Sequence, residues 1–343
     1  MKIGIAIFPT DKAIQPVQLA KEVEDRGFES LWFPEHSHIP TSRITPWGGR
    51  EGAPPLPEEY WRTHDQFVGL AAAAAVTENL MLGTGITLVA QRDPLWLAKE
   101  CASLDLISNG RFILGIGYGW NKEEMANHGI KYTERRAITR ENMLACREIW
   151  ANDEAEFSGE HVNFDSSWSW PKPVQPGGPK VLLGGAAGPK TIQDIVEFCD
   201  GWMPISGRHD LTGPIEEVRQ AAEDAGRDPA TLEFGQFGTP GKPDVLESLE
   251  AAGVSRAVLW VHPKDPIRSC HYSTRTRSYF EMTDSAVGVE MLDIFDDMGR
   301  HVGVKPRDQV HLAGDWHRVF HCQITTIRDG VPSLILQLSL IHI

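Results

Sequence analysis

The sequence predicts an α/β protein folded as a (β/α)8 TIM barrel with insertions, and two observations support this prediction. Eight apolar strand patterns alternate with helical patterns along residues 3–260. The strand patterns lack polar alternation, as do strands that are buried on both faces of a parallel sheet. The chain has 343 residues, and a barrel of this kind takes about 250 residues as one unit. We therefore expect one barrel and a shorter remainder.

The stretch Leu80–Trp120 contains one complete strand–helix–strand unit. Its first strand, Leu80–Thr84, is followed by a helix that opens at Asp93–Pro94, where Asp can cap the helix and Pro loses no hydrogen bond. Asn109–Gly110 ends this helix, because both residue types tolerate positive φ. The second strand, Arg111–Gly117, ends in glycines. Glycines at the carboxyl ends of parallel strands let a ligand approach the backbone.

The remaining elements follow in the same alternating order. The other strands are expected at Ile3–Phe8, Ser30–Phe33, Lys180–Leu183, Trp202–Pro204, Leu232–Phe237 and Ala257–Trp260. The other helices are expected at Val17–Arg26, over the alanine run Ala71–Ala75, and at Asn121–His128, Glu134–Trp150, up to Cys199, Ile215–Ala225 and Asp244–Ala251. One insertion runs from the strand Ser30–Phe33 to about Glu59, and an irregular one spans Glu156–Pro179. Excursions of this length are usually lids or binding loops.

The last helix of the barrel is missing from the pattern. After Val261 the sequence has no apolar period of 3.6 residues, so we predict a barrel domain over residues 1–262 and a disordered junction over 263–288. A barrel strand without its helix would expose an apolar patch from Ala257–Trp260, with Ile5 and Ile7 nearby.

Composition excludes several classes of protein. Forty-seven acidic and 33 basic residues give a net charge of −14, which is the wrong sign for binding nucleic acid. The five cysteines are scattered without a metal-binding spacing, as expected for a reducing cytoplasm. The run Ala71–Ala75 is too short to span a bilayer, and we expect neither a targeting segment nor an anchor.

Glu35–His36 comes directly after a predicted strand, where barrel enzymes place catalytic side chains. Imidazole is the group best suited to exchange a proton near neutral pH, so His36 is a candidate acid or base, and capping of a loop is the alternative. His38 lies two residues further on, but no third ligand follows at a suitable spacing, so we expect no metal.

Four ordered motifs carry a resemblance to a known family. They are LWFPEHSHIP, LGTGITLVAQRDPLWLAKECASLDLISNGRFILGIGYGWNKEEM, WSWPKPVQPGGPKVLLGG and CDGWMPI. Together they resemble the luciferase-like monooxygenase superfamily, in particular its branch of coenzyme F420-dependent oxidoreductases. The resemblance covers roughly Met1 to Val261 and implies a (β/α)8 barrel with insertions.

The resemblance also implies roles for individual residues. Family members carry an acidic residue and a histidine beside the reactive face of the cofactor, which gives Glu35 and His36 catalytic roles. Glu35 would fix the tautomer of His36 or bind the cofactor ring. In the F420-dependent branch, a non-prolyl cis peptide at Gly85–Ile86 supports the deazaflavin ring. The cofactor-binding residues implied in this way are Gly85, Ile86, Thr87, Gly117, Tyr118, Gly119, Asn121, Gly184, Gly185 and Ala186.

Three functions stay open at this point. The first is an F420-dependent oxidoreductase that transfers a hydride to or from a small organic substrate, with a homodimer left open. An FMN-dependent monooxygenase is the alternative, because the acid–histidine pair also occurs in that branch. The third is a cofactor-binding barrel without catalysis. The insertions carry five aromatic residues, of which most are expected to pack and one or two to face the site: Trp47, Tyr60, Trp61, Trp168 and Trp170.

The end of the chain resembles a different family. Residues 290–329 are similar to the opening of a Nudix hydrolase, with a hairpin around Asp297–Gly299 and then Gly314–Arg318 leading into a strand. The metal-binding helix of that family, rich in Arg and Glu, is absent from this sequence. We therefore expect residues 289–343 to be a truncated, Nudix-like fragment with no hydrolase activity, ending in a non-native C-terminus.

Overall fold

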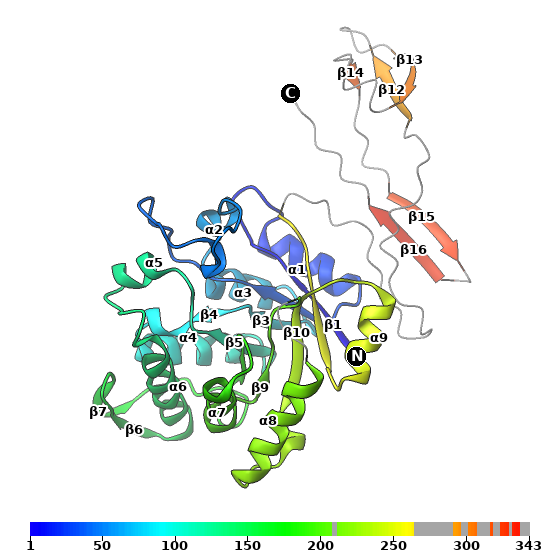
Figure 1. The fold of residues 1–343 in the computed structure, drawn as a ribbon. Coiled ribbons are helices and arrows are strands. Elements are labelled where there is room, and N and C mark those ends of the chain that lie inside the picture. The colour runs from blue at the N-terminus through cyan, green and yellow to red at the C-terminus, as the bar shows by residue number, and fades with distance from the viewer. Residues whose placement is uncertain are drawn as a thin grey trace. The chain divides into compact units, whose positions relative to one another are not determined.

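The computed structural model describes residues 1–207 and 211–263 and, beyond them, five strands between residues 291 and 336. Within the described residues, eight parallel strands close a barrel, which confirms the predicted fold class (Figure 1). The order is β1-β2-β3-β5-β8-β9-β10-β11, and β11 pairs with β1. The bounds are β1 (Lys2–Ala6), β2 (Ser30–Phe33), β3 (Met81–Thr84), β5 (Phe112–Gly117), β8 (Lys180–Leu183), β9 (Gly201–Trp202), β10 (Glu233–Thr239) and β11 (Arg256–Trp260).

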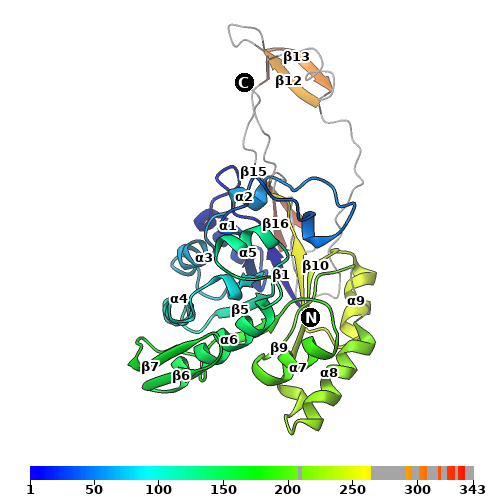
Figure 2. The same cartoon turned by 60° about the vertical axis from the view of Figure 1, so that its left-hand side comes forward.

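Helices surround the barrel, as Figures 1 and 2 show from two directions. They are α1 (Pro16–Asp25), α2 (Glu59–Arg62), α3 (Gln66–Ala74), α4 (Pro94–Ile107), α5 (Lys122–Asn127), α6 (Arg135–Ala151), α7 (Pro189–Phe198), α8 (Thr212–Asp224) and α9 (Pro243–Ala251). Short elements between them are η1 (Trp47–Gly49), β4 (Thr87–Leu88), η2 (Val89–Gln91) and η3 (Pro229–Thr231). Asp93 caps α4 as predicted, and Asn109 after it has a φ of 55°. None of the described helices is long and apolar enough to cross a membrane.

The sequence predicted an irregular second insertion, but part of it forms regular structure. It begins with an antiparallel hairpin of β6 (Glu154–Ser158) and β7 (Asn163–Trp168). Most side chains of both strands are exposed, so the hairpin has no apolar pattern that sequence analysis could detect. The stacked rings of Phe157 and Phe164, with centroids 6.4 Å apart, join its strands.

Trp32 of β2 fills the interior of the barrel. Its side chain is fully buried. A Cβ on Gly83 would lie 2.2 Å from its ring, and one on Gly4 would lie 2.9 Å from its Nε1. A Cβ on Gly115 would lie 2.0 Å from the carbonyl oxygen of Thr84. Gly83 and Gly115 therefore serve the packing of the barrel rather than ligand approach. The apolar residues clustered with Trp32 are Ala6, Ile113, Leu182, Met203, Phe237 and Val258.

The amino ends of the strands are joined by a buried ionic cluster. Arg256 at the start of β11 is 1% exposed. Its guanidinium donates to both oxygens of Glu29, at 2.7 and 3.0 Å, and to Glu233 of β10. Glu29 precedes β2, Glu233 begins β10, and Arg256 begins β11. The cluster therefore joins these three strands at the end of the barrel opposite to the predicted site.

The apolar patch predicted on the outer face of β11 is not exposed. Ala257 and Leu259 are 0% and 7% exposed, and Ile5 and Ile7 are 5% and 1% exposed. Val258 lies in the core cluster, so alternation along β11 directs the side chains of Ala257 and Leu259 outward. Both side chains are nevertheless buried. The prediction of an exposed patch is therefore wrong, although no helix follows β11 within the described residues up to Pro263.

The chain divides into two compact units, Met1–Lys264 and Asp265–Ile343. The first ends close to the predicted barrel boundary, and the predicted junction lies outside the described residues apart from Pro263. In the second unit, antiparallel pairs join β12 to β13, β12 to β14, and β15 to β16. Their bounds are β12 (Met291–Phe295), β13 (His301–Pro306), β14 (Trp316–His317), β15 (Gln323–Arg328) and β16 (Val331–Leu336). The pairing of β12 with β13 agrees with the predicted hairpin, while the Nudix resemblance stays a prediction.

Replacing Gly83 by alanine tests the packing around Trp32. We expect Gly83→Ala to lower the free energy of unfolding by about 1–3 kcal/mol, because the added methyl group overlaps a ring in a closed core. Urea denaturation followed by tryptophan fluorescence measures this. The control is Gly213→Ala in α8, where no atom lies within 4 Å of the new Cβ and stability should not fall. A Gly83→Ala protein as stable as the wild type would contradict this account of the core.

Candidate active site

His36, the predicted acid or base, lies directly after β2 and has a buried carboxylate partner. Its Nδ1 lies 2.8 Å from Oε2 of Glu124 in α5. The side chain of His36 is 6% exposed and that of Glu124 is 0% exposed. Because an ionised carboxylate only accepts hydrogen bonds, the hydrogen of the ring sits on Nδ1, and Nε2 is the nitrogen that can exchange a proton with a substrate. Glu124 lies 88 residues away in the sequence and was not among the predicted site residues.

Glu35, the other predicted catalytic residue, has different partners from those expected. Its carboxylate accepts hydrogen bonds from the backbone N–H of Leu88 at 2.6 Å and from Nε of Arg92 at 2.7 Å. The expectation that Glu35 fixes the tautomer of His36 therefore needs correction, since Glu124 makes that hydrogen bond. Burial lowers the pKa of Arg92, but Glu35 and the neighbouring carboxylates outweigh burial and raise it. Glu35 thus fastens the end of β2 to the segment after β4.

Aromatic rings lie next to His36. Tyr60 and Trp120 have ring centroids 5.2 and 5.8 Å from that of His36, and Trp47 lies 5.8 Å from Tyr60. Tyr60 is therefore the insertion residue that reaches the site, with Trp47 behind it. Trp120 follows β5 and was not among the aromatic residues selected from the sequence. The other three selected residues are exposed, at 50%, 78% and 56%: Trp61, Trp168 and Trp170.

His38 belongs to a polar cluster with Ser37, Asn127 and His128. Oγ of Ser37 lies 2.9 Å from Nδ1 of His38 and 2.8 Å from Nε2 of His128. Nδ2 of Asn127 lies 2.9 Å from Nε2 of His38. Burial first and His38 second lower the pKa of His128, which favours its neutral form. Among the described residues, no group of three or more His, Cys, Asp or Glu could hold a metal ion.

The predicted cofactor-binding segment after β3 has the backbone that the family resemblance implies. The Gly85–Ile86 peptide bond is cis. The side chain of Ile86 lies against two of the other predicted turns, since a Cβ on Gly117 or Gly184 would lie 2.6 or 3.4 Å from it. Thr87 is fully buried, and its hydroxyl accepts a hydrogen bond from Gln66 at 2.9 Å. This hydrogen bond fastens the segment after β3 to α3.

The turns after β5 and β8 lie side by side. A Cβ on Gly185 would lie 3.9 Å from the ring of Tyr118, whose hydroxyl donates to Asp194 of α7 at 2.5 Å. The guanidinium of Arg136 lies 3.9 Å from the centroid of the Tyr118 ring. Burial and the Asp194 carboxylate raise the pKa of Tyr118, so its hydroxyl stays neutral. Tyr118 therefore fixes the two turns to α7. Gly119 has a φ of 74°, which allows the sharp turn before α5.

Two features of these turns leave hydrogen-bond donors available to a ligand. Asn121 caps α5 through its side-chain oxygen, but its Nδ2 is buried and has no partner among the described residues. Helix α7 begins at Pro189, and Gly188 before it offers no side-chain cap, while Gly185 and Ala186 are exposed. Unpaired N–H groups at the start of a helix favour an anion.

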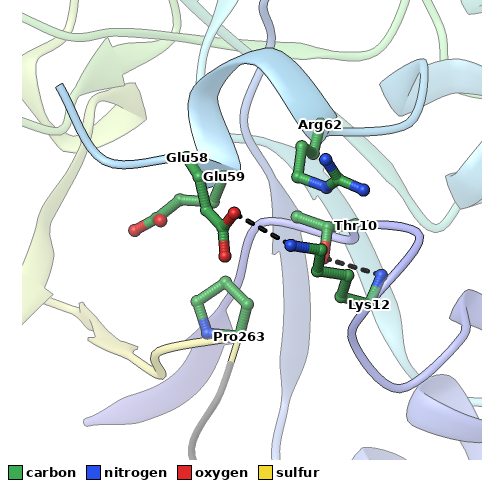
Figure 3. A pocket seen from close by; sticks show the side chains of 6 residues that line it. All are labelled: Thr10, Lys12, Glu58, Glu59, Arg62 and Pro263. Atoms are coloured by element: carbon green, nitrogen blue, oxygen red, sulfur yellow. Dashed lines mark hydrogen bonds and ion pairs between the residues drawn. The ribbon is translucent and has the colours of Figure 1, made fainter.

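The first insertion, residues 37–58, is fastened beside this site by ion pairs at its end. Nζ of Lys12 lies 3.0 Å from Glu58, and Arg62 donates to Asp11 at 2.6 Å. Figure 3 shows the small cavity at this junction, which has a volume of about 10 Å³. It is lined by Thr10, Lys12, Glu58, Glu59, Arg62 and Pro263. A volume of this size holds about one water molecule, so it is not the substrate site.

A parallel barrel with a buried histidine–carboxylate pair and glycine turns at the carboxyl ends of its strands has the organisation of a barrel enzyme. The family model described as luciferase-like monooxygenase matches residues 9–252. The chain therefore belongs to the luciferase-like monooxygenase family, whose members are oxidoreductases and monooxygenases. This confirms the family that the four sequence motifs indicated.

Three similar proteins place the chain within the family. An uncharacterised protein of Mycobacterium tuberculosis is 40% identical over 229 residues, which cover 66% of this chain and 80% of that one. The F420-dependent hydroxymycolic acid dehydrogenase of the same organism is 28% identical over 228 residues, covering 66% and 57%. The crystal structure of monooxygenase RslO1 from Streptomyces bottropensis superposes with a TM-score of 0.59 at 26% identity, covering 74% and 75%.

Proposed function

We propose that this protein is an F420-dependent oxidoreductase that moves a hydride between the deazaflavin and a small organic substrate. The observation that carries the proposal is the buried pair of His36 and Glu124 at the carboxyl end of the barrel. A histidine whose Nδ1 is held by a carboxylate presents Nε2 for proton exchange, which hydride transfer to or from an oxygen-bearing carbon requires. A relative named for its F420 dependence supports the choice of cofactor.

The residues around the pair fit a phosphorylated, planar cofactor. The partnerless amide donor of Asn121 and the uncapped start of α7 at Gly188 suit a ribityl chain and a phosphate. The Gly85–Ile86 segment and the turns at Gly117 and Gly184 would support the ring system at the strand ends. When bound, reduced F420 would supply a hydride, that is one hydrogen with two electrons, to a substrate carbon.

His36 handles the proton that accompanies this hydride. In the reducing direction, His36 starts as the imidazolium with a hydrogen on each ring nitrogen. The π electrons of the substrate carbonyl group move to its oxygen, which takes the proton from Nε2 and becomes a hydroxyl group, and His36 is left neutral with its hydrogen on Nδ1. In the oxidising direction, Nε2 accepts the hydroxyl proton as the carbon gives up its hydride. Glu124 stabilises the charged imidazolium and keeps the ring oriented in both directions.

An FMN-dependent monooxygenase is the second candidate, and the similarity to the monooxygenase RslO1 favours it. The two candidates differ in cofactor, so ligand identification separates them. We expect the purified protein to bind F420 more tightly than FMN in a fluorescence titration, and absorbance and mass spectrometry to identify F420 as the ligand retained. Equal affinities, or tighter binding of FMN, would reassign the protein to the monooxygenases. Binding of F420 without turnover of any substrate would support a barrel that binds the cofactor without catalysis.

His36→Ala tests the proposed acid–base role. We expect kcat to fall by about 10²- to 10⁴-fold, the usual contribution of general acid–base catalysis, while the Kd for F420 stays unchanged. Steady-state kinetics and fluorescence titration measure the two quantities. The control is His128→Ala, which removes an exposed histidine at the end of α5 and should leave kcat unchanged. An unaltered rate for His36→Ala would remove this residue from the mechanism.

Gly188→Asp tests whether α7 binds the cofactor phosphate. Gly188 has extended backbone, with a φ of −179°, and nothing within 4 Å of a Cβ, so Asp fits and caps the helix. Its charge would repel a phosphate, and we expect the Kd for F420 to rise about tenfold, which corresponds to about 1.4 kcal/mol.

Gly188→Asn is the matched control for that variant, because it caps the helix without adding a charge. It should bind F420 like the wild type, and neither variant should melt at a lower temperature than the wild type. If Asp and Asn at this position gave the same Kd, the phosphate would have to lie elsewhere.

A further inference from the structure

A second cavity, of about 250 Å³, lies among the outer helices and the hairpin of β6 and β7. We call it the hairpin cavity, and it is lined by Ala90, residues 92–95, Ile130, Ile138, Asn142 and residues 161–164. Figures 1 and 2 show the hairpin beside α6, which carries two of these residues. Neither His36 nor Glu124 is part of the lining. The volume is just below the range of roughly 300–1,000 Å³ for drug-sized ligands, so a smaller molecule would fill it.

Part of the lining of the hairpin cavity is apolar. It is formed by Leu95 of α4, Ile130 before α6, Ile138 of α6 and Phe164 of β7. The ring of Phe164 stacks on that of Phe157, which fixes its position in the hairpin. Leu95 is 44% exposed although it is apolar, so a molecule with an apolar body would remove this side chain from water.

The hairpin cavity also offers two hydrogen-bond acceptors. Asn142 is 2% exposed, and its Nδ2 donates to the carbonyls of Val89 and Arg92, both at 3.0 Å. Its Oδ1 accepts no hydrogen bond from any described residue, and a donor in the cavity would satisfy this oxygen. Asp93, the next residue after Arg92, caps α4 through Oδ1. Its Oδ2 has no partner in the described part of the chain.

The charges around the hairpin cavity favour a cation. Arg92 lines the cavity, but each of its three side-chain nitrogens already donates to a carboxylate: Nε to Glu35 and one Nη to Glu100, both at 2.7 Å, and the other Nη to Asp65 at 3.1 Å. With Asp93, four carboxylates therefore lie around one guanidinium. An excess of negative charge attracts a cation and repels an anion.

We propose that the hairpin cavity binds a small, protonated primary amine with an apolar body. Its ammonium group donates to Oδ1 of Asn142 and Oδ2 of Asp93, and its body lies against Ile138 and Phe164. An ammonium group has three donors and no acceptor, which matches a site that offers acceptors. This ligand is additional to the substrate and the cofactor, so the inference does not rest on the proposed hydride transfer.

Three probes of nearly the same shape test the preference for a cation. Benzylammonium carries a positive charge, benzyl alcohol is uncharged, and benzoate is an anion. In calorimetric titrations of the full-length protein at neutral pH without cofactor, we expect benzylammonium to bind at least about tenfold more tightly than benzyl alcohol, and benzoate to bind most weakly. Benzylammonium should also raise the melting temperature, as a ligand of the folded state does.

Substitutions in the lining test where benzylammonium binds. Asp93→Asn removes the charge but keeps a good helix cap, so the Kd for benzylammonium should rise about tenfold while that for benzyl alcohol stays unchanged. Asp228→Asn is the matched control, because Asp228 is also exposed, precedes a proline and caps η3 through its side chain. It should leave both Kd values unchanged.

Asn163→Asp adds a carboxylate at an exposed position of the lining. It should tighten the binding of benzylammonium about threefold, a gain that a damaged fold would not give. Weaker or unchanged binding in this variant would contradict the proposed location of the ammonium group.

The remaining outcomes are equally decisive. Equal Kd values for benzylammonium and benzyl alcohol, or tighter binding of benzoate, would overturn the inference. Equal binding of benzylammonium by the wild type, Asp93→Asn and Asp228→Asn would overturn it too, because it would show only the general attraction of an amine to a protein with a net charge of −14. None of these titrations involves F420 or turnover, so a failure of the proposed function would be seen separately.

Discussion

The barrel depends on the fit of one indole ring inside it. Trp32 is fully buried, and its Nε1 donates to Oγ of Ser30 on the same strand, at 2.8 Å, so the polar atom of the ring is satisfied without water. Room for the ring exists because β1 and β3 carry Gly4 and Gly83 where it passes. Since β2 ends one residue after Trp32 and leads directly to His36, the packing of this indole fixes the point at which the proposed catalytic histidine leaves the barrel.

The two ends of the barrel use charge in different ways. At the amino end, Arg256 forms ion pairs with both Glu29 and Glu233, and these ion pairs hold the strands together. At the carboxyl end, the His36–Glu124 pair leaves one ring nitrogen without a partner inside the pair. The first arrangement is closed and stabilising, and the second is open to a substrate. This division of stability and chemistry between the two ends is the usual organisation of (β/α)8 enzymes.

The buried strands could be predicted from the sequence, because their apolar runs have clear ends. Ser30–Phe33 and Lys180–Leu183 are observed with the predicted bounds. Contacts between distant residues could not be predicted in this way. Glu124 was missed because the local pattern does not show which acidic residue of α5 contacts His36, which follows a strand far away in the sequence. The role of Gly115 was likewise misread, because a glycine that makes room for a neighbouring backbone or side chain and one that admits a ligand look the same in a sequence.

The insertion after β2 differs from the rest of the site in how it is held. Lys12–Glu58 and Arg62–Asp11 are ion pairs at the surface, with Lys12 and Asp11 about half exposed at 51% and 56%. Pairs of this kind weaken as dissolved ions screen them, whereas a fully buried carboxylate is shielded from that effect. Ionic strength therefore acts on the ion pairs beside Tyr60 while leaving the buried pair of His36 and Glu124 intact. The environment can adjust how firmly the entrance is held without altering the chemistry behind it.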